Sequence, residues 1–219
     1  MVKPSQIFKN DGDKTQHTVV SLLEGFVNME TAPFSLYDAS GARKYLNAAE
    51  RAAFLDAAQK MEPRICAFCE VLALTGCRVS EALELCRERV DLAQASLIFR
   101  TLKRRAEHFR SVPVPRQLID RLLALPPGVG QGRTPRARFF PECRQTYWEY
   151  VKLVMDAAGI KGPQACPKGL RHGFGMRAVE RGVPEGLLQR WLGHARRETT
   201  DVYLQAVGPE ERAFAERTW

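Results

Sequence analysis

The sequence has no long apolar run and no apolar segment near its first residue. No stretch of the 219 residues approaches the roughly 18 consecutive apolar residues that a membrane-spanning helix needs. The opening residues, MVKPSQIFKNDGDK, also lack the apolar centre of a secretory signal peptide. We therefore expect a cytoplasmic protein with no membrane partner, and the 45% hydrophobic content predicts a packed core.

The six cysteines lack the pattern of a disulfide framework and of a zinc ribbon. Thiols of an intracellular chain of this length are expected to stay reduced. Cys66 and Cys69 form a C-x-x-C pair, but RICAFCEVLALTGC continues as an apolar helical pattern without the tight turn of a zinc knuckle. The sequence therefore predicts no metal and no other cofactor.

Acidic side chains are scarcer than basic ones, and the imbalance is confined to one part of the chain. The sequence holds 33 Lys and Arg against 25 Asp and Glu, a net charge of +8. Residues 1–45 carry five of each sign, so the whole excess falls after residue 45. A polyanion such as nucleic acid is a natural partner for that part, although many basic proteins bind none.

The periodicity predicts a mainly α fold with a small antiparallel β-sheet, an α+β class. Asn47 with Glu50 three residues later has the form of a capping box, and Gly76 ends the next helical pattern. Gly173 and Gly175 within a later helix indicate close approach of another segment. We expect helices over residues 47–61, 64–75, 80–85, 117–125, 141–158, 167–181, 184–192 and 199–206, a β-hairpin over 96–115 and a loop over 126–138.

Cleavage of a phosphodiester without a metal ion sets a minimum list of side chains. Negative charge builds up on the non-bridging oxygens in the transition state, and the planar guanidinium of arginine suits those oxygens best. A nucleophile and a proton donor for the leaving oxygen complete the list. Taken singly, each such residue in this chain also has an ordinary structural explanation, so only their joint order and spacing favour chemistry.

That order and spacing resemble the tyrosine recombinase, or phage integrase, family. LALTGCRVSEALEL (72–85) is similar to the first signature of the family, and PKGLRHGFG (167–175) with WLGHARRETTDVY (191–203) is similar to the second. The resemblance implies that Arg78 and Arg171 clamp the phosphate, that His194 donates to it and that Tyr203 is the nucleophile. It further implies a tyrosine recombinase catalytic-domain fold over residues 46–219. Residues 1–45 are then an N-terminal arm, too short for the core-binding domain of full-length members.

The resemblance also implies less certain roles for the hairpin and for the start of the second signature. Lys103, as the only lysine of the hairpin, is expected to protonate the leaving 5′ oxygen. Lys168 stands where the family usually has histidine, and it contacts the phosphate or takes the phenolic proton if neighbouring cations lower its pKa. Further DNA contacts are expected from four residues, namely Arg104, Arg105, Arg110 and His172.

The implied activity is site-specific recombination of double-stranded DNA. Tyr203 attacks the scissile phosphate, a 3′-phosphotyrosyl bond stores the phosphodiester energy, and no ATP, metal or small-molecule substrate takes part. Such proteins act as homo-oligomers, typically tetramers, on DNA, which implies a cytoplasmic, nucleoid-associated protein. Two alternatives stay open: an accessory DNA-binding module that performs no strand exchange, and a DNA-relaxing enzyme that uses the same chemistry.

Overall fold

Asn47 begins the helical part of the fold as the sequence predicts. In the computed structural model its side chain accepts a hydrogen bond from the backbone N–H of Glu50, and the Glu50 carboxylate accepts from the backbone N–H of Asn47. The structure describes residues 35–101, 108–126, 128–129, 137–204, 212 and 215–216. Apart from Ser35, all of these lie in the unit Leu36–Trp219.

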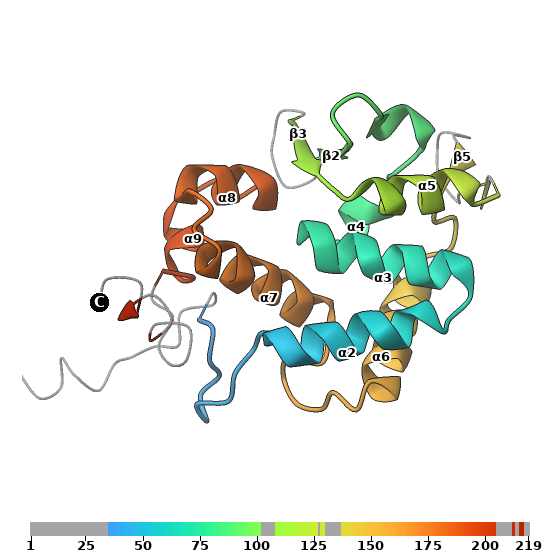
Figure 1. The fold of residues 1–219 in the computed structure, drawn as a ribbon. Helices are drawn as coiled ribbons and strands as arrows, with labels where there is room; N and C mark the ends of the chain where they lie inside the picture. The colour runs from blue at the N-terminus through green and yellow to red at the C-terminus, as the bar shows by residue number, and fades with distance from the viewer. Residues whose placement is uncertain are drawn as a thin grey trace, which may run out of the picture. The chain divides into compact units, whose positions relative to one another are not determined.

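The described helices lie at the predicted positions, although those predicted over 80–85 and 199–206 end earlier. They are α2 (Ala48–Gln59), α3 (Pro63–Thr75), α4 (Val79–Ala82), α5 (Arg116–Ala124), α6 (Arg144–Ala157), α7 (Pro167–Glu180), α8 (Glu185–Leu192) and α9 (Glu198–Asp201), with a 3₁₀ turn, η1, over Arg87–Arg89. Helix α3 ends at Gly76, whose left-handed φ of 61° is easy only for glycine. The ribbon in Figure 1 shows α3 between α2 and α5, with α7 and α8 on the side away from β5.

The predicted hairpin is present, and a further short strand joins it. Strands β2 (Ser96–Arg100) and β3 (Phe109–Pro113) pair antiparallel, with Phe99 opposite Arg110. Strand β1 (Val90–Asp91) pairs with β2 to make a three-stranded sheet that was not predicted. The predicted loop over 126–138 also contains two paired strands, β4 (Gly128–Val129) and β5 (Ala137–Arg138). Two-residue strands are too short to produce an alternating pattern, which is why the sequence did not indicate them.

Two groups of buried side chains stabilise this arrangement. The larger joins α2, α3, α5, α6 and the sheet, and includes Phe54, Phe68 and Tyr147. The smaller lies around α7 and α8 and includes Leu188, Leu192 and Tyr203. All six cysteines are free thiols, four of them buried. Within the part of the chain that the structure describes, no helix combines the length and apolar character needed to span a bilayer.

Candidate active site

Arg78 lies at the turn between α3 and α4, where its backbone N–H and its guanidinium both donate to the carboxylate of Glu81. The backbone N–H of Arg78 donates to Oε2 of Glu81 at 2.9 Å, and its Nη1 donates to Oε1 at 2.9 Å. The turn itself depends on Gly76, because a Cβ there would lie 2.6 Å from the ring of Phe174. The Arg78 side chain remains 31% exposed, so its guanidinium is held in place and still open to solvent.

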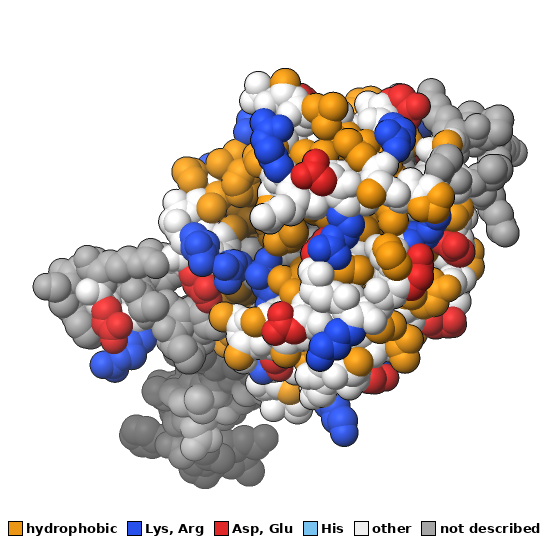
Figure 2. Space-filling model, turned by 45° about the vertical axis from the view of Figure 1, so that its right-hand side comes forward, with side chains coloured by type: hydrophobic (Ala, Val, Ile, Leu, Met, Phe, Trp, Pro, Cys, Tyr) orange, Lys and Arg blue, Asp and Glu red, His pale blue; other side chains and the backbone are white. Residues whose placement is uncertain are grey.

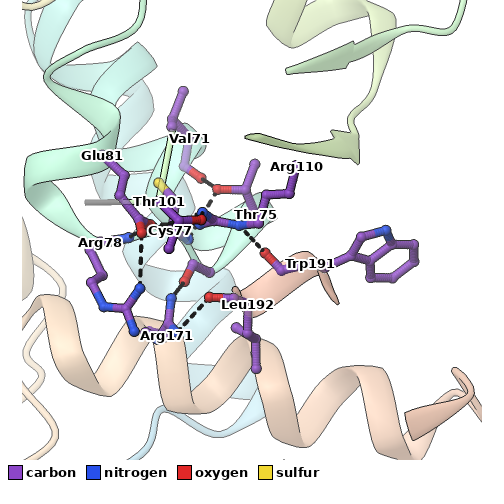
Figure 3. A network of polar contacts seen from close by, with 11 residues as sticks. Val71, Thr75, Cys77, Arg78, Glu81, Thr101, Arg110, Arg171, Trp191 and Leu192 are labelled. Atoms are coloured by element: carbon purple, nitrogen blue, oxygen red, sulfur yellow. Dashed lines mark hydrogen bonds and ion pairs between the residues drawn. The ribbon is translucent and has the colours of Figure 1, made fainter. Parts of the chain in front are cut away.

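Glu81 also forms a buried ion pair with Arg110. Nη2 of Arg110 donates to Oε2 of Glu81 at 2.6 Å, and each side chain is only 1% exposed. The same guanidinium donates to Oγ1 of Thr101 at 3.0 Å and to the carbonyl oxygen of Trp191 at 2.8 Å. Arg110 therefore joins β3 to α4 and α8 in the interior (Figure 3). The sequence analysis assigned Arg110 to DNA, but in this structure its donors are used by protein oxygens.

Arg171, on α7, ties together the ends of two other helices. Its Nη1 donates to the carbonyl oxygen of Gly76 and its Nη2 to that of Leu192, both at 2.7 Å. Burial, together with the nearby charge of Arg78, lowers the pKa of Arg171 to about 10, so it is still a cation at neutral pH. Figure 3 shows Arg78 and Arg171 close together, although they lie 93 positions apart in the chain.

His194 follows α8 and faces the same region. Gly193 ends the helix with a φ of 65°, and the backbone N–H of His194 bonds to the carbonyl oxygen of Gln189. The imidazole is 7% exposed, and its Nδ1 lies 2.9 Å from Oγ1 of Thr200. Burial and the charges of Arg171 and Arg78 lower the pKa of His194 to about 3, so the ring is neutral at pH 7.

Tyr203 is buried between α7 and His194. Its side chain is 1% exposed, and its ring lies parallel to that of His194, with 9° between the ring planes. A Cβ on Gly175 would lie 2.5 Å from this ring, which explains the glycine predicted to allow close approach. Burial raises the pKa of the phenol to about 12, although the charges of Arg171 and Arg78 both act to lower it. The phenol is therefore protonated and covered in this conformation.

His172 contacts Tyr203, which the sequence analysis did not predict. The Nδ1 atom of His172 lies 3.1 Å from the phenolic oxygen, and the imidazole is only 5% exposed. The sequence assigned His172 to DNA, whereas the structure places it against the proposed nucleophile. Lys168 lies one helical turn earlier, is exposed, and its charge acts on His172. The i, i+4 spacing places Lys168 and His172 on one face of α7, so the sequence could have indicated that these two residues share their surroundings.

The hairpin was predicted to supply three further site residues. Lys103, Arg104 and Arg105 lie outside the described residues, between β2 and β3. Among the residues that are described, no three or more His, Cys, Asp or Glu side chains gather where they could hold a metal ion. The cluster described above presents guanidinium, imidazole and phenol groups.

The sequence of this chain is similar to those of integrases and tyrosine recombinases. Residues 44–208 match the profile of the family described as the phage integrase family. The chain is 30% identical over 170 residues to tyrosine recombinase XerD of Vibrio vulnificus strain YJ016, covering 71% of this chain and 54% of that protein. It is 29% identical over 153 residues to tyrosine recombinase XerA of Pyrococcus furiosus, covering 65% and 50%. The chain thus spans about half the length of the curated relatives it matches.

Solved structures share the fold. The crystal structure of XerA recombinase superimposes with a TM-score of 0.66 at 22% identity, covering 83% of this chain and 65% of that one. The catalytic domain of bacteriophage HP1 integrase gives a TM-score of 0.58 at 24% identity, covering 78% and 93%. XerH recombinase bound to its difH substrate gives 0.65 at 19% identity, covering 87% and 57%.

Proposed function

The chain belongs to the phage integrase family of tyrosine recombinases, and from this premise we propose that it cleaves and rejoins double-stranded DNA at specific sites. In the proposed reaction Tyr203 becomes covalently joined to a 3′ phosphate, and the exchange needs neither ATP nor a metal ion. The fold class supports the proposal but does not carry it, because folds host unrelated activities.

The observation that carries the proposal is the convergence of four distant residues. Arg78 follows α3, Arg171 lies on α7, His194 follows α8 and Tyr203 follows α9. The charges of Arg78 and Arg171 both act on Tyr203 and on His194, so all four groups share one electrostatic environment. A phosphate placed there meets two fixed cations and a nucleophile, which is the arrangement that a metal-free transesterification requires.

The proposed step conserves the energy of the phosphodiester. Tyr203 gives its phenolic proton to a neighbouring base as its oxygen attacks phosphorus, the bond to the 5′ oxygen breaks, and Lys103 donates a proton to that oxygen. Arg78, Arg171 and His194 hold the non-bridging oxygens, and Lys168 adds positive charge at their edge. Attack by a 5′ hydroxyl on the phosphotyrosine reverses the step, so recombination needs no external energy source. Because the phenol is covered in the described conformation, a phosphate reaches it only after a local displacement of the groups that cover it.

The proposed partners are duplex DNA and further copies of the chain. XerH recombinase has been solved in complex with its difH DNA substrate, which supports DNA as the partner here. Figure 2 shows Lys and Arg side chains on the face it draws, intermixed with acidic and hydrophobic ones. The distribution of charge alone therefore does not identify the face that binds DNA. We instead expect DNA to bind over the active-site cluster. A homo-oligomer, expected to be a tetramer, brings two DNA sites together, which implies a nucleoid-associated protein in the cytoplasm.

A second candidate function is DNA binding without strand exchange. Membership of the family does not by itself require strand exchange, because one fold can host different activities. Binding without exchange is also consistent with the covered phenol of Tyr203. On this alternative the chain is an accessory or regulatory module at recombination sites.

A covalent trapping experiment separates the two functions. The full chain is incubated with nicked suicide duplexes tiled across the DNA that flanks its gene, and the products are resolved on a denaturing gel. We expect a protein–DNA adduct with the wild-type chain and with Tyr150→Phe, a change on α6 outside the cluster, but none with Tyr203→Phe. Retarded DNA on a native gel with no covalent adduct for any variant supports the accessory module and contradicts the recombinase.

A further inference from the structure

His172 lies within hydrogen-bonding distance of the phenolic oxygen of Tyr203. Its Nδ1 atom lies 3.1 Å from that oxygen, with 5.9 Å between the ring centroids. Among the residues that the structure describes, no other side chain forms a hydrogen bond with this phenol. Lys168, the other basic residue on this side of α7, is exposed and makes no such bond in the described chain. Contact with the reacting oxygen therefore distinguishes His172 from Lys168.

The imidazole of His172 is held in a state able to accept a proton. Burial lowers its pKa to about 4, and the charges of Lys168, Arg171 and Lys44 act in the same direction. The ring is consequently neutral at pH 7, with a lone pair on one nitrogen. The phenol, whose pKa is raised to about 12, keeps its proton and is able to donate it to Nδ1.

The second nitrogen of His172 has an unusual environment. Nε2 is buried and has no hydrogen-bond partner among the described residues. Leaving a buried polar atom unpaired costs about 1–3 kcal/mol, and a catalytic role is one of the reasons for which native proteins keep such an atom. Pure packing against Tyr203 does not require a polar ring, because phenylalanine has a similar shape without that cost.

We propose that His172 is a catalytic residue that accepts the phenolic proton of Tyr203 at Nδ1 while the phenolic oxygen attacks the phosphate. This inference rests on the function proposed above and assigns a role that the sequence analysis gave to Lys168. Lys168, exposed at the start of α7, then contributes charge toward the phosphate and no proton transfer.

The step balances. The bond from the phenolic oxygen to phosphorus forms as the bond from phosphorus to the 5′ oxygen breaks. The phenolic proton moves to Nδ1 of His172, which becomes an imidazolium, and the leaving 5′ oxygen receives its proton from the general acid proposed above. In rejoining, the 5′ hydroxyl loses its proton to that acid, and His172 returns its proton to the departing phenolate.

The substrate itself makes His172 a better base. The ionisable groups that face the ring are Lys168 and Arg171 on α7, Lys44 ahead of α2, Tyr203, and His194 after α8. Burial lowers the pKa of His172 in the free protein, and the three cations act in the same direction. A phosphodiester bound among the cations brings a compensating negative charge, which offsets their contribution and raises the pKa of His172. The ring therefore gains proton affinity when the reacting phosphate arrives.

The first test is the pH dependence of adduct formation. Single-turnover rates are measured on the suicide duplex that traps the wild-type chain, from pH 5.5 to 8.5, for wild type, His172→Asn and Lys168→Gln. Asparagine keeps an acceptor near the position of Nδ1 but takes up no proton. We expect His172→Asn to react about 100-fold more slowly at pH 7, with a rate that rises as pH increases, because hydroxide must then remove the phenolic proton. We expect the pH profile of Lys168→Gln to parallel that of wild type.

The outcomes separate the inference from the function on which it rests. If wild type forms no adduct, the proposed function and the inference fail together. If wild type reacts and His172→Asn keeps both its rate and its pH profile, only the inference fails. A steep profile in Lys168→Gln and a flat one in His172→Asn assigns the base to Lys168 instead.

A second measurement is made on the wild-type chain, so its result does not depend on whether His172→Asn folds. Nitrogen-15 NMR of the full wild-type chain at pH 7 reports which imidazole nitrogen of His172 carries the proton, with Tyr203→Phe used to assign the signal. We expect the proton on Nε2 and a hydrogen-bonded acceptor at Nδ1. A proton on Nδ1, donated to the phenol, overturns the proposal.

Discussion

Glu81 and Arg110 form an ion pair inside the protein, with 2.6 Å between Oε2 and Nη2 and each side chain 1% exposed. The same carboxylate holds the guanidinium of Arg78, which is open to solvent. One buried acid thus connects the hairpin and α8 to a residue of the candidate active site. Its position connects the stability of the fold to the geometry of the candidate active site.

Glu81→Gln is expected to destabilise the protein strongly. The substitution leaves the guanidinium of Arg110 buried without an opposite charge, and losing one partner of a buried pair costs about 3–5 kcal/mol. Urea denaturation measures the change in the free energy of unfolding. The matched control is Glu185→Gln, whose partner Arg197 is 71% exposed, and it is expected to cost far less than Glu81→Gln because solvent screens the pair. Equal losses in the two variants contradict a structural role for the buried pair.

Two buried histidines are expected to make the protein less stable in mild acid. The folded-state pKa is about 4 for His172 and about 3 for His194, against an ordinary 6.5. Between these values the unfolded chain binds more protons, so stability is full above pH 6.5 and falls as pH decreases toward the folded pKa. From pH 7 to pH 5 we expect a loss of about 2 kcal/mol for each histidine, measured by urea denaturation.

Variants identify the source of that pH dependence. His172→Asn and His194→Asn should each remove about half of the loss between pH 7 and pH 5, because asparagine does not titrate. A loss that is unchanged in both variants shows that other groups are responsible. Glu81 contributes mainly at lower pH. Burial acts to raise the pKa of its carboxyl, but the hydrogen bond and charge of Arg110 hold that pKa below its usual range.

Gly175→Ala is expected to displace Tyr203. The added Cβ would lie 2.5 Å from two atoms of the Tyr203 ring, and overpacking of this kind costs about 1–3 kcal/mol. Because the ring also meets His172, the rate of covalent trapping should change together with the melting temperature. Gly186→Ala on α8 is the control, since nothing lies within 4 Å of its added Cβ. That control should be neutral or stabilising by up to about 1 kcal/mol, and a similar result for Gly175→Ala refutes the close contact.

Arg171→Lys is expected to lower the rate of covalent trapping by about 100-fold or more. The two terminal nitrogens of Arg171 donate to the carbonyl oxygens of Gly76 and Leu192, whereas lysine has one terminal nitrogen on a flexible stem. Arg177→Lys, on the same helix but outside the cluster, is the control and should react at nearly the wild-type rate. A retained rate in Arg171→Lys shows that charge without the planar geometry suffices.

Local chemistry explains which parts of the fold were predictable. The capping box of Asn47 and Glu50 and the left-handed Gly76 are formed by residues a few positions apart, so their signals are present in the sequence. The two-residue strands β1, β4 and β5 were missed because two residues are too few to show the alternation by which a strand is recognised. The hairpin of β2 and β3 was predicted because its alternating residues also face a core.

The sequence alone determined the order and spacing of Arg78, Arg171, His194 and Tyr203, because a family signature consists of residue types at fixed separations. Only the tertiary structure decided which way other polar side chains face. Arg110 lies in a strand where alternate residues point to opposite sides, and the packing of α4 and α8 against that sheet turns it toward Glu81. His172 meets Tyr203 for a similar reason, since contact between α7 and the segment after α9 depends on the glycine at position 175 and on burial of both rings.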